Sequence, residues 1–308
     1  MPKAYKSQLR AALLAVTAFS GTSAMAQQSA PQPIAPPPFE QVYKMPVVYS
    51  VPGEDKVQVR RDIVYKTVGG PAGSNLELKL DVYTPREAKP GDRFAAVVLI
   101  SGGGAGDHDW RDSGVYNSYG RIIAASGFTA ITFSKRYERT MDDSVKLEDF
   151  HDLVHYIRNH AAELHVNADD LAFWGFSGGG LLLSPVVAEM QPYARAAVCF
   201  YCVADVDFPL TQGTDSKASE RLSLTAQIEN ARETVPAIFV GRAGWDSADL
   251  NRKLDRFVAE AMAKNLPIEV MNHPTGRHGF DIIDPNARSR EIIQRALEFL
   301  RTHLGEAN

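Results

Sequence analysis

Six short apolar runs, separated by glycine-containing loops and amphipathic segments, constrain the fold of this chain more than any other feature. They are residues 95–100, 128–133, 171–174, 196–201, 237–240 and 268–271. Apolar runs of this length are typical of strands buried on both faces of a parallel sheet, and the segments between them are long enough for crossover helices. The alternation therefore predicts an α/β fold, with a mainly parallel central sheet and helices on both faces.

Two further β-type stretches precede this pattern, at residues 57–67 and 76–83. The turn-forming segment Gly69-Gly70-Pro71-Ala72-Gly73 separates them, so we expect an N-terminal antiparallel hairpin. Between the later strands, apolar residues recur at three- and four-residue steps over residues 145–164. This spacing predicts a helix whose single apolar stripe packs on the sheet.

The N-terminus has the parts of an export signal. Three basic residues come first, an apolar stretch over residues 11–19 follows, and small residues precede Gln27. This arrangement predicts a signal peptide over residues 1–26 that is cleaved after Ala26, and hence a periplasmic or secreted product. A membrane anchor is the alternative interpretation. The stretch is shorter than the roughly 20 residues that a spanning helix needs, so we expect no stable membrane insertion after cleavage.

Prolines dominate the segment that follows the predicted signal. Residues 27–38 contain five of them and no core-forming pattern. We therefore interpret residues 27–45 as a proline-rich linker and residues 46–308 as one domain. Within that domain, residues 203–235 are mostly polar and form a longer connection than strands usually need, which predicts a cap or a pocket insertion.

The overall composition favours a globular protein that acts on a small molecule. Apolar residues make up 44% of the chain and charged residues 23%, which is enough apolar material for a substantial core. The formal net charge is -4, and no run of Lys or Arg interrupts the body of the chain. This balance argues against nucleic-acid binding, while the oligomeric state stays open.

The only two cysteines, Cys199 and Cys202, lie at the end of an apolar run. In a continuous strand, a three-residue offset places their side chains on opposite faces, too far apart for a bridge. We expect two buried free thiols. A disulfide is the alternative if the strand ends before Cys202.

The segment Gly175-Phe176-Ser177-Gly178-Gly179 has the G-x-S-x-G pattern. It follows the apolar run 171–174 and precedes the helix-compatible residues 181–190, so it has the strand-turn-helix context of a nucleophile elbow. Glycines flank the serine because a strained turn leaves no room for side chains there. An ordinary helix cap is the alternative use of Ser177.

Two observations favour the nucleophile over the cap. The loop Ser101-Gly102-Gly103-Gly104 follows the strand 95–100, where backbone N–H groups can point at an oxyanion. Acidic residues and a histidine also follow Ser177 in the chain order that a Ser-Asp-His triad requires.

Two histidines, His273 and His278, follow the strand 268–271 in a loop that leads back to the catalytic edge of the sheet. We choose His278 as the base because it lies at the far end of this loop, just before the predicted helix 287–304; His273 is the alternative. Elsewhere, His151 and His155 lie four residues apart on the helix 145–164 and distantly resemble a zinc motif. They flank the apolar stripe, which favours a solvated helix face over a metal site.

At this point the chain resembles the α/β hydrolases, and within them the dienelactone-hydrolase-like and acetyl-esterase-like carboxylesterases. The similarity runs from about Val57 to the C-terminus. It is carried by Leu80-Asp81-Val82-Tyr83-Thr84-Pro85, the loop Ser101 to Gly104, Asp149, Gly175 to Gly179, Gly241-Arg242-Ala243-Gly244-Trp245-Asp246, and His278-Gly279-Phe280.

The resemblance implies an α/β-hydrolase fold and a role for individual residues. Ser177 is implied as nucleophile, Asp246 as triad acid and His278 as base, with backbone N–H donors from Gly178 and from Gly102 or Gly103. Two residues depart from the family pattern. Ser101 stands where many esterases have His in a His-Gly-Gly-Gly loop, which leaves the donor pair open. True dienelactone hydrolases have Cys as nucleophile, so Ser177 favours ester substrates.

The triad acid has a second candidate, because Asp246 and Asp249 both follow the strand 237–240. Asp246 ends the glycine-containing loop 241–245, from which a carboxylate can reach over the sheet edge toward His278. Asp249 fits the first turn of the next helix, where the macrodipole favours an acid. We therefore predict Asp246 as the triad acid.

These features together predict an exported serine hydrolase that cleaves small carboxylic esters through an acyl-enzyme intermediate, without a cofactor. A serine peptidase of the same fold shares the site chemistry and is the first alternative. A metal-dependent hydrolase at His151 and His155, or a non-catalytic binding protein of this fold, are further alternatives.

Overall fold

The computed structural model describes seven stretches of the chain: residues 37–70, 73–102, 109–136, 143–190, 192–205, 220–231 and 235–305. The predicted signal peptide over residues 1–26, the first part of the linker and Gly103 lie outside these stretches.

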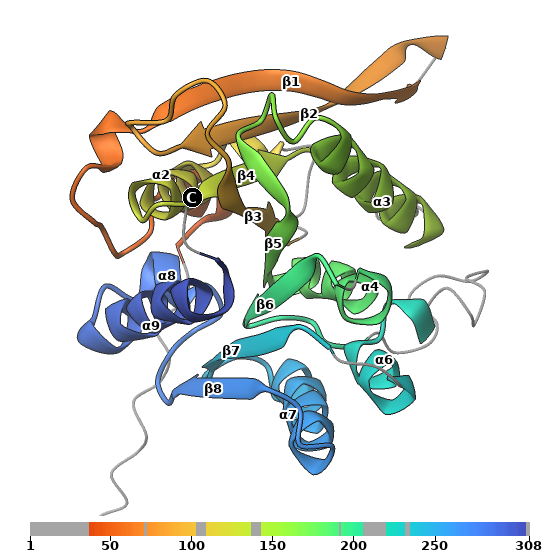
Figure 1. Ribbon diagram of the computed structural model, residues 1–308. Coiled ribbons are helices and arrows are strands. Elements are labelled where there is room, and N and C mark those ends of the chain that lie inside the picture. Colours follow the sequence, from red (N-terminus) through yellow and green to blue (C-terminus); the bar gives the residue numbers. More distant parts are fainter. Residues whose placement is uncertain are drawn as a thin grey trace, which may run out of the picture. The chain divides into compact units, whose positions relative to one another are not determined.

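One sheet of eight strands organises the described part of the chain, in the order β1-β2-β4-β3-β5-β6-β7-β8 (Figure 1). The pairs β1–β2 and β2–β4 are antiparallel, and every other neighbouring pair is parallel. Both the mainly parallel sheet and the N-terminal hairpin were predicted from the sequence and are confirmed. The strands are β1 (Gln58–Gly69), β2 (Asn75–Thr84), β3 (Phe94–Ile100), β4 (Thr129–Phe133), β5 (Val166–Phe176), β6 (Ala194–Phe200), β7 (Ala237–Ala243) and β8 (Ile268–His273).

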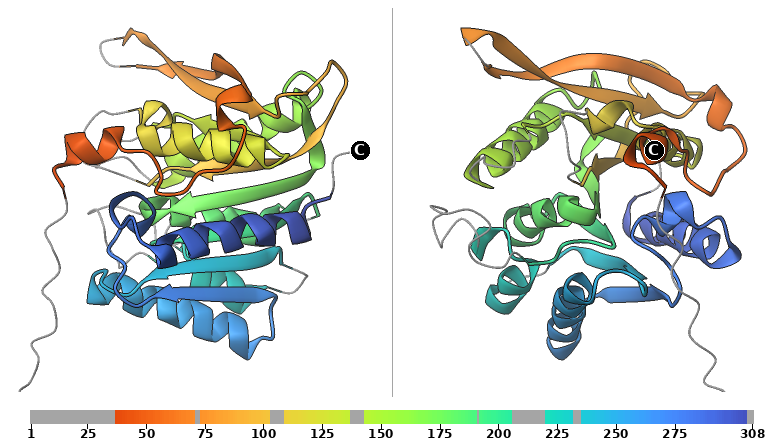
Figure 2. Two further views of the ribbon diagram at one scale, coloured as in Figure 1. Left: turned by 90° about the vertical axis from the view of Figure 1, so that its left-hand side faces the viewer. Right: turned by 180° about the vertical axis from the view of Figure 1, so that it is seen from behind.

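Helices cover both faces of this sheet, as Figures 1 and 2 show. One face carries α2 (Gly114–Ala125), α8 (Phe280–Ile283) and α9 (Ala287–His303). The other face carries α3 (Asp143–Asn159), α4 (Leu183–Glu189), α6 (Leu224–Asn230) and α7 (Ala248–Ala263). The strands between them are apolar on both sides because each sheet face is covered, and two apolar clusters result, one on each face. Among the described helices, none is both long and apolar enough to cross a membrane.

Polar side chains define where several of these helices begin. Ser247 accepts a hydrogen bond from the Leu250 N–H at the start of α7, at 3.2 Å. Asn286 does the same for the Ser289 N–H at the start of α9, at 3.0 Å. Capping of this kind satisfies N–H groups that have no partner within the helix. The loops before α7 and α9 are thereby held in place, and both lead to the edge of the sheet where the candidate site lies.

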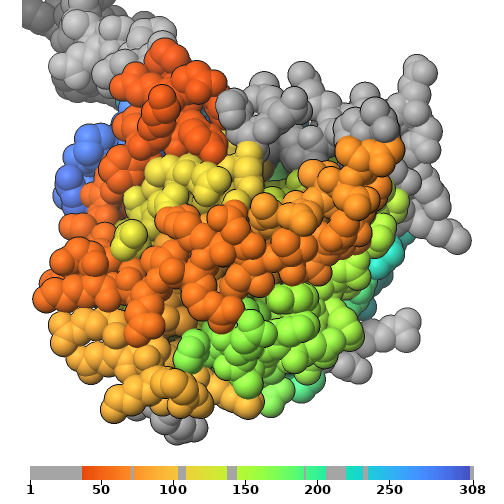
Figure 3. Space-filling view, turned by 90° about the horizontal axis from the view of Figure 1, so that it is seen from above, coloured from red at the N-terminus to blue at the C-terminus, as the bar shows by residue number. Residues whose placement is uncertain are grey.

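The short helix α1 (Phe39–Lys44) lies in the segment that the sequence analysis assigned to the linker 27–45. It contacts α2, and the two can be followed side by side in Figure 3, in red and yellow. A Cβ atom at Gly114 would collide with the backbone carbonyl groups of Lys44 and Met45, so the chain after α1 lies directly on the start of α2. Residues 39–45 are therefore part of the packed domain.

The two cysteines are free and buried, as predicted. The argument from opposite faces of a continuous strand does not apply, however, because β6 ends at Phe200 and Cys202 lies beyond the strand. The thiol of Cys202 lies 3.3 Å from the Gly175 carbonyl oxygen, beneath the strand that leads to Ser177. Cys202 thus packs under the candidate site as a small buried side chain.

The direction of the crossover connections reverses between β3 and β5. β4 follows β3 along the chain and lies on one side of it, whereas β5 lies on the other side. In open α/β sheets such a reversal leaves a crevice beyond the carboxyl ends of the strands, and ligands bind there. Ser101 and Gly102 follow β3 and Ser177 follows β5, so these residues lie beside this crevice.

Candidate active site

Ser177 lies at the sharp turn between β5 and the short helix η4 (Ser177–Leu182). Its φ angle is 52°, in the left-handed region that residues with a side chain rarely adopt. Such a conformation costs about 1–2 kcal/mol and persists only where the surrounding structure enforces it. The strand-turn-helix context predicted for Ser177 is therefore present, with the backbone strain of a nucleophile elbow.

The flanking glycines explain how the turn is enforced. A Cβ atom at Gly179 would collide with the Ile100 carbonyl oxygen at the end of β3, and one at Gly175 would lie 3.0 Å from Leu183 Cδ1. The turn thus presses its own backbone against the neighbouring strand. Only glycine permits so close an approach.

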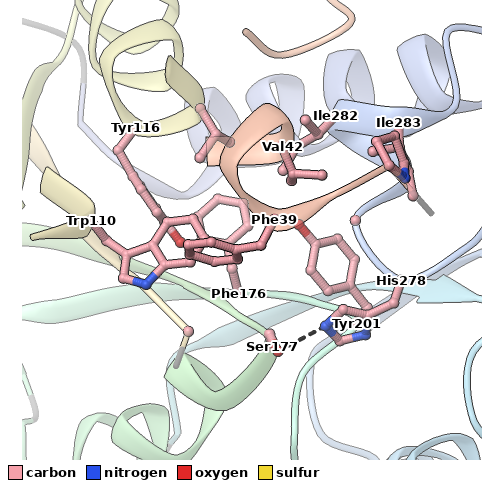
Figure 4. A pocket seen from close by; sticks show the side chains of 14 residues that line it. Phe39, Val42, Trp110, Tyr116, Phe176, Ser177, Tyr201, His278, Ile282 and Ile283 are labelled. Atoms are coloured by element: carbon pink, nitrogen blue, oxygen red, sulfur yellow. Dashed lines mark hydrogen bonds between the residues drawn. The ribbon is translucent and has the colours of Figure 1, made fainter. Parts of the chain in front are cut away.

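His278 lies in the loop between β8 and α8 and connects two of the predicted residues. Its Nε2 is 2.8 Å from Ser177 Oγ, and its Nδ1 is 2.6 Å from Asp246 Oδ2. The Nδ1–H donates a hydrogen bond to the carboxylate, which leaves Nε2 free to accept the hydrogen bond of the serine hydroxyl. Three residues from three loops, predicted separately, thus form one hydrogen-bonded chain, drawn in part in Figure 4.

Asp246 is well shielded from solvent, with a side chain 7% exposed. It follows β7, and its second oxygen accepts a hydrogen bond from the Ser247 N–H at 2.7 Å. This bond orients the carboxylate toward His278. A shielded carboxylate also interacts more strongly with a developing positive charge than an exposed one does.

The alternative acid and the alternative base have other partners. Asp249 is exposed on α7, and hydrogen bonds to Lys253 hold the pKa of its carboxyl below the usual range. His273 is buried at the end of β8, and its Nε2 lies 3.1 Å from Asn286 Oδ1 and 3.2 Å from Ser289 Oγ. Its burial lowers its pKa. Both residues stabilise the start of a helix, so the structure brings neither of them to Ser177.

Gly102, two residues after the end of β3, lies against the elbow. A Cβ atom there would stand 2.8 Å from Ser177 Cβ and 3.3 Å from the Gly178 nitrogen. The backbones of Gly102 and Gly178 therefore meet beside the serine, where an oxyanion would form. The loop is tied down through Ser101, because Lys135 Nζ donates to Ser101 Oγ at 2.6 Å and to its carbonyl oxygen at 2.9 Å. Burial lowers the pKa of Lys135 to about 8.

A mostly apolar pocket of about 320 Å³ opens above Ser177 and His278 (Figure 4). Its wall comes mainly from three separated segments, α1, the stretch from Trp110 to Tyr116, and α8. Phe176 at the end of β5 and Tyr201 just after β6 complete it. Phe39 packs edge-on against Trp110, with ring centroids 5.4 Å apart. The remaining wall residues are Pro37, Val42, Val115, Phe176, Tyr201, Gly279, Ile282 and Ile283.

Sequence reasoning missed this wall, since its residues show no common spacing. Aromatic residues in the proline-rich segment before residue 46 were the one available signal, because a free linker has little use for Phe39 and Tyr43. The Tyr43 hydroxyl in fact donates to the Asp109 carbonyl oxygen at 2.7 Å. The described residues of the predicted cap, 203–205, 220–231 and 235, do not line this pocket.

The second histidine pair lies in a separate, polar depression on α3 lined by His151, His155, Arg158 and Tyr193. His155 Nε2 is 2.7 Å from Asn159 Nδ2, and His151 Nε2 is 3.4 Å from Glu189 Oε2. Within the described stretches, no group of three or more His, Cys, Asp or Glu side chains is arranged to hold a metal ion.

Comparison with known proteins places the chain in a family. No curated protein sequence matches it. Among solved structures, the apo form of esterase 2 from the planctomycete Thermogutta terrifontis aligns with a TM-score of 0.64 and 22% identity, over 82% of this chain and 98% of that one. The same esterase with propionate bound aligns with a TM-score of 0.64 and 22% identity, over 83% and 98%. Its form phosphoramylated by tabun aligns with a TM-score of 0.62 and 22% identity, over 81% and 95%. These likenesses show a shared fold.

The sequence itself matches the BD-FAE family model over residues 80–235, which is just over half of the chain. This segment includes the second half of β2, strands β3 to β6, the glycine loop after β3 and the elbow at Ser177. The chain is a member of the BD-FAE family, an α/β-hydrolase-type esterase domain.

Proposed function

We propose that this protein is an exported serine esterase, in which Ser177, His278 and Asp246 cleave carboxylic esters through an acyl-enzyme intermediate. One observation carries the proposal. A serine in a strained, left-handed conformation shares a hydrogen-bonded chain with His278 and Asp246 at the base of an apolar pocket.

The hydrogen bonds of His278 support a proton transfer from Ser177 to the imidazole. His278 Nε2 takes the proton of Ser177 as the serine oxygen attacks the ester carbonyl carbon, and it returns that proton to the leaving alcohol. Asp246 holds the imidazole in the required tautomer and stabilises its charged form without taking the proton itself. Water then attacks the acyl-enzyme by the same route and releases the acid.

The negative charge that develops on the carbonyl oxygen needs donors beside Ser177. Backbone N–H groups at Gly178 and at Gly102 or Gly103 are the proposed donors, and the close approach of Gly102 to the elbow supports the first two. Rigid backbone donors need no reorganisation when the charge forms, which is why they stabilise a transition state well.

The wall of the pocket indicates the kind of substrate. Apart from Ser177 and His278, the described residues that line it are apolar, aromatic or glycine. An uncharged, apolar group next to the ester gains free energy there by leaving water. A charged group would lose its hydration without finding a partner.

The decisive test uses an organophosphonate probe and mass spectrometry on the purified protein. The probe should label wild type at Ser177, and Ser177→Ala should lose both the label and nearly all hydrolysis of nitrophenyl esters while keeping the fold. Ser184→Ala is the matched control, because Ser184 is also a buried serine, on α4, and its hydroxyl has no hydrogen-bond partner among the described residues. Label on another residue, or activity that survives Ser177→Ala, would reject the assignment.

Export is a separate part of the proposal and rests on residues 1–26. Basic residues, an apolar stretch and small residues before Gln27 occur in the order of a signal peptide. Expression of the full chain in a bacterial host, followed by mass spectrometry of each cell fraction, should recover a periplasmic or secreted form that begins at Gln27. A cytoplasmic protein with an intact N-terminus would contradict this part and leave the esterase assignment untouched.

A further inference from the structure

Tyr201 combines strain, burial and contact with the candidate base. It is the first residue after β6, it is only 4% exposed, and its φ angle of 39° lies in the left-handed region. For a bulky residue this conformation is costly and persists only where other contacts enforce it. Backbone hydrogen bonds supply part of the restraint: the Tyr201 N–H donates to the Gly241 carbonyl oxygen, and the Val203 N–H donates to the Ser177 carbonyl oxygen, both at 2.8 Å.

The side chain of Tyr201 reaches His278 from a different direction than Ser177 and Asp246 do. Its ring centroid lies 4.8 Å from that of the imidazole, with the planes at 59°. Its hydroxyl donates to Asp281 Oδ1 at 2.6 Å. Asp281 is the third residue after His278 and lies on α8. Tyr201 thus packs on the histidine and is bonded to the helix that follows the histidine.

Asp281 is fully buried, and its second oxygen accepts a hydrogen bond from the Tyr119 hydroxyl at 2.8 Å. Burial raises the pKa of this carboxyl to about 6. Burial also raises the pKa of the Tyr201 hydroxyl well above its usual value, so the hydroxyl stays a donor. Two tyrosines therefore hold one carboxylate, but only the Tyr201 ring touches His278, while the Tyr119 ring packs on Trp174 and Phe176.

We propose that Tyr201, anchored through Asp281, is a positioning residue that keeps the imidazole of His278 aligned between Ser177 and Asp246. The proposal rests on the esterase mechanism above and assigns a role to a residue outside the triad.

The geometry of the imidazole explains why such a residue is useful. The bonds to Ser177 and Asp246 leave through the two ring nitrogens, so they fix the position of the ring within its own plane. They resist tilting out of that plane only weakly, and the His278 side chain is 41% exposed. The Tyr201 ring packs against the imidazole and opposes this tilt. A displacement of about 1 Å in a reacting group can lower a rate by about 100-fold.

Two matched variants test the proposal, Tyr201→Phe and Tyr119→Phe. Each removes one hydroxyl from the same buried carboxylate, so we expect similar losses of melting temperature. Only Tyr201→Phe releases a ring that contacts His278. We expect its kcat and its rate of phosphonylation to fall about 10-fold with KM within about threefold, whereas Tyr119→Phe keeps kcat within about threefold. Tyr201→Leu removes the ring as well and should lower kcat by about 100-fold.

A proton NMR spectrum supplies a readout that needs no turnover. The proton between His278 and Asp246 gives a far-downfield signal, which we expect to weaken in Tyr201→Phe, to vanish in Tyr201→Leu and to persist in Tyr119→Phe. Equal kcat values and equal signals in the two Phe variants would overturn the proposal, and so would an effect of Tyr201→Phe on KM alone. If wild type neither hydrolyses esters nor reacts with the probe, the esterase assignment fails, and the NMR comparison still decides whether Tyr201 positions His278.

Discussion

The floor and the wall of the pocket differ in the atoms that make their contacts: backbone atoms in the floor and side chains in the wall. The floor includes Ser177 and Gly102, and Gly179 lies behind the serine; backbones touch here, and an added Cβ at either glycine would collide with its neighbours. The wall consists mainly of aromatic and aliphatic side chains from α1, from residues 110–116 and from α8. Backbone contacts tolerate almost no change, while side-chain contacts can be repacked. We therefore expect the chemistry to depend on the floor and substrate selection to depend on the wall.

The largest effect is expected on the floor side, at the proposed triad acid, Asp246. Asp246→Asn keeps the shape of the carboxylate but favours the wrong tautomer of His278, so kcat should fall by about 10⁴-fold. Asp249→Asn is the control, because Asp249 is exposed and paired with Lys253, and its kcat should stay within about threefold. Steady-state kinetics and melting curves of both variants check this. A collapse of kcat in Asp249→Asn with a near-normal Asp246→Asn would reverse the assignment.

Replacement of Gly102 tests whether kcat depends on the close backbone contact between Gly102 and the turn at Ser177. In Gly102→Ala the new Cβ would stand 2.8 Å from Ser177 Cβ and 2.9 Å from the Phe176 carbonyl oxygen, so the loop must shift away from the elbow. Loss of one oxyanion donor costs about 100- to 1000-fold in kcat, and we expect an effect of this size. Gly69→Ala is the matched control, since a Cβ there meets nothing within 4 Å. Near-normal kcat in Gly102→Ala would remove Gly102 from the oxyanion site.

The buried carboxyl of Asp281, beneath the floor, should make stability depend on pH. Its pKa in the folded protein, about 6, lies above the ordinary value of 3.8, so the folded state holds this proton more tightly than the unfolded state does. The stability that this group contributes is present below about pH 4 and is lost as pH rises through about 6. Between about pH 4.5 and 7.5 the loss should be about 2 kcal/mol.

Urea unfolding of wild type and Asp281→Asn at those two pH values measures this loss. Because other groups titrate equally in both proteins, the difference between their pH dependences isolates Asp281. Identical pH dependences would show that the carboxyl titrates near its ordinary value and that its burial has no such cost.

The smallest effect is expected on the wall. Phe39→Ala removes the aromatic contact with Trp110, worth about 1 kcal/mol, and opens the pocket toward solvent. KM for nitrophenyl esters with a long apolar acyl chain should rise about fivefold, while kcat changes by less than about twofold. Phe39→Leu should recover part of the loss. A fall in kcat equal to the rise in KM would show that α1 also supports the floor, and it would weaken the division between the two regions.

The floor was predictable from sequence because its requirements are local. A left-handed serine between glycines, after an apolar strand and before a helix, produces a pattern within nine residues of sequence, 171–179. The fold followed in the same way from the length and spacing of the apolar runs. The choice of His278 over His273 needed only the order of strand, loop and helix. In the structure, His273 is instead hydrogen-bonded to Asn286 and Ser289 at the start of α9.

The wall and the support of His278 were not predictable, because they depend on contacts between distant parts of the chain. Phe39 meets Trp110 across 71 residues, and Tyr201 bonds to Asp281 across 80. Such a pair leaves no periodic pattern in the sequence, and a tyrosine after an apolar strand resembles any other core residue. The sequence by itself determined the sheet, the elbow and the residue types at the catalytic edge, since each follows from backbone geometry over a few residues. Only the tertiary structure decided which side chains surround that edge, since packing in three dimensions depends on shape and not on order along the chain.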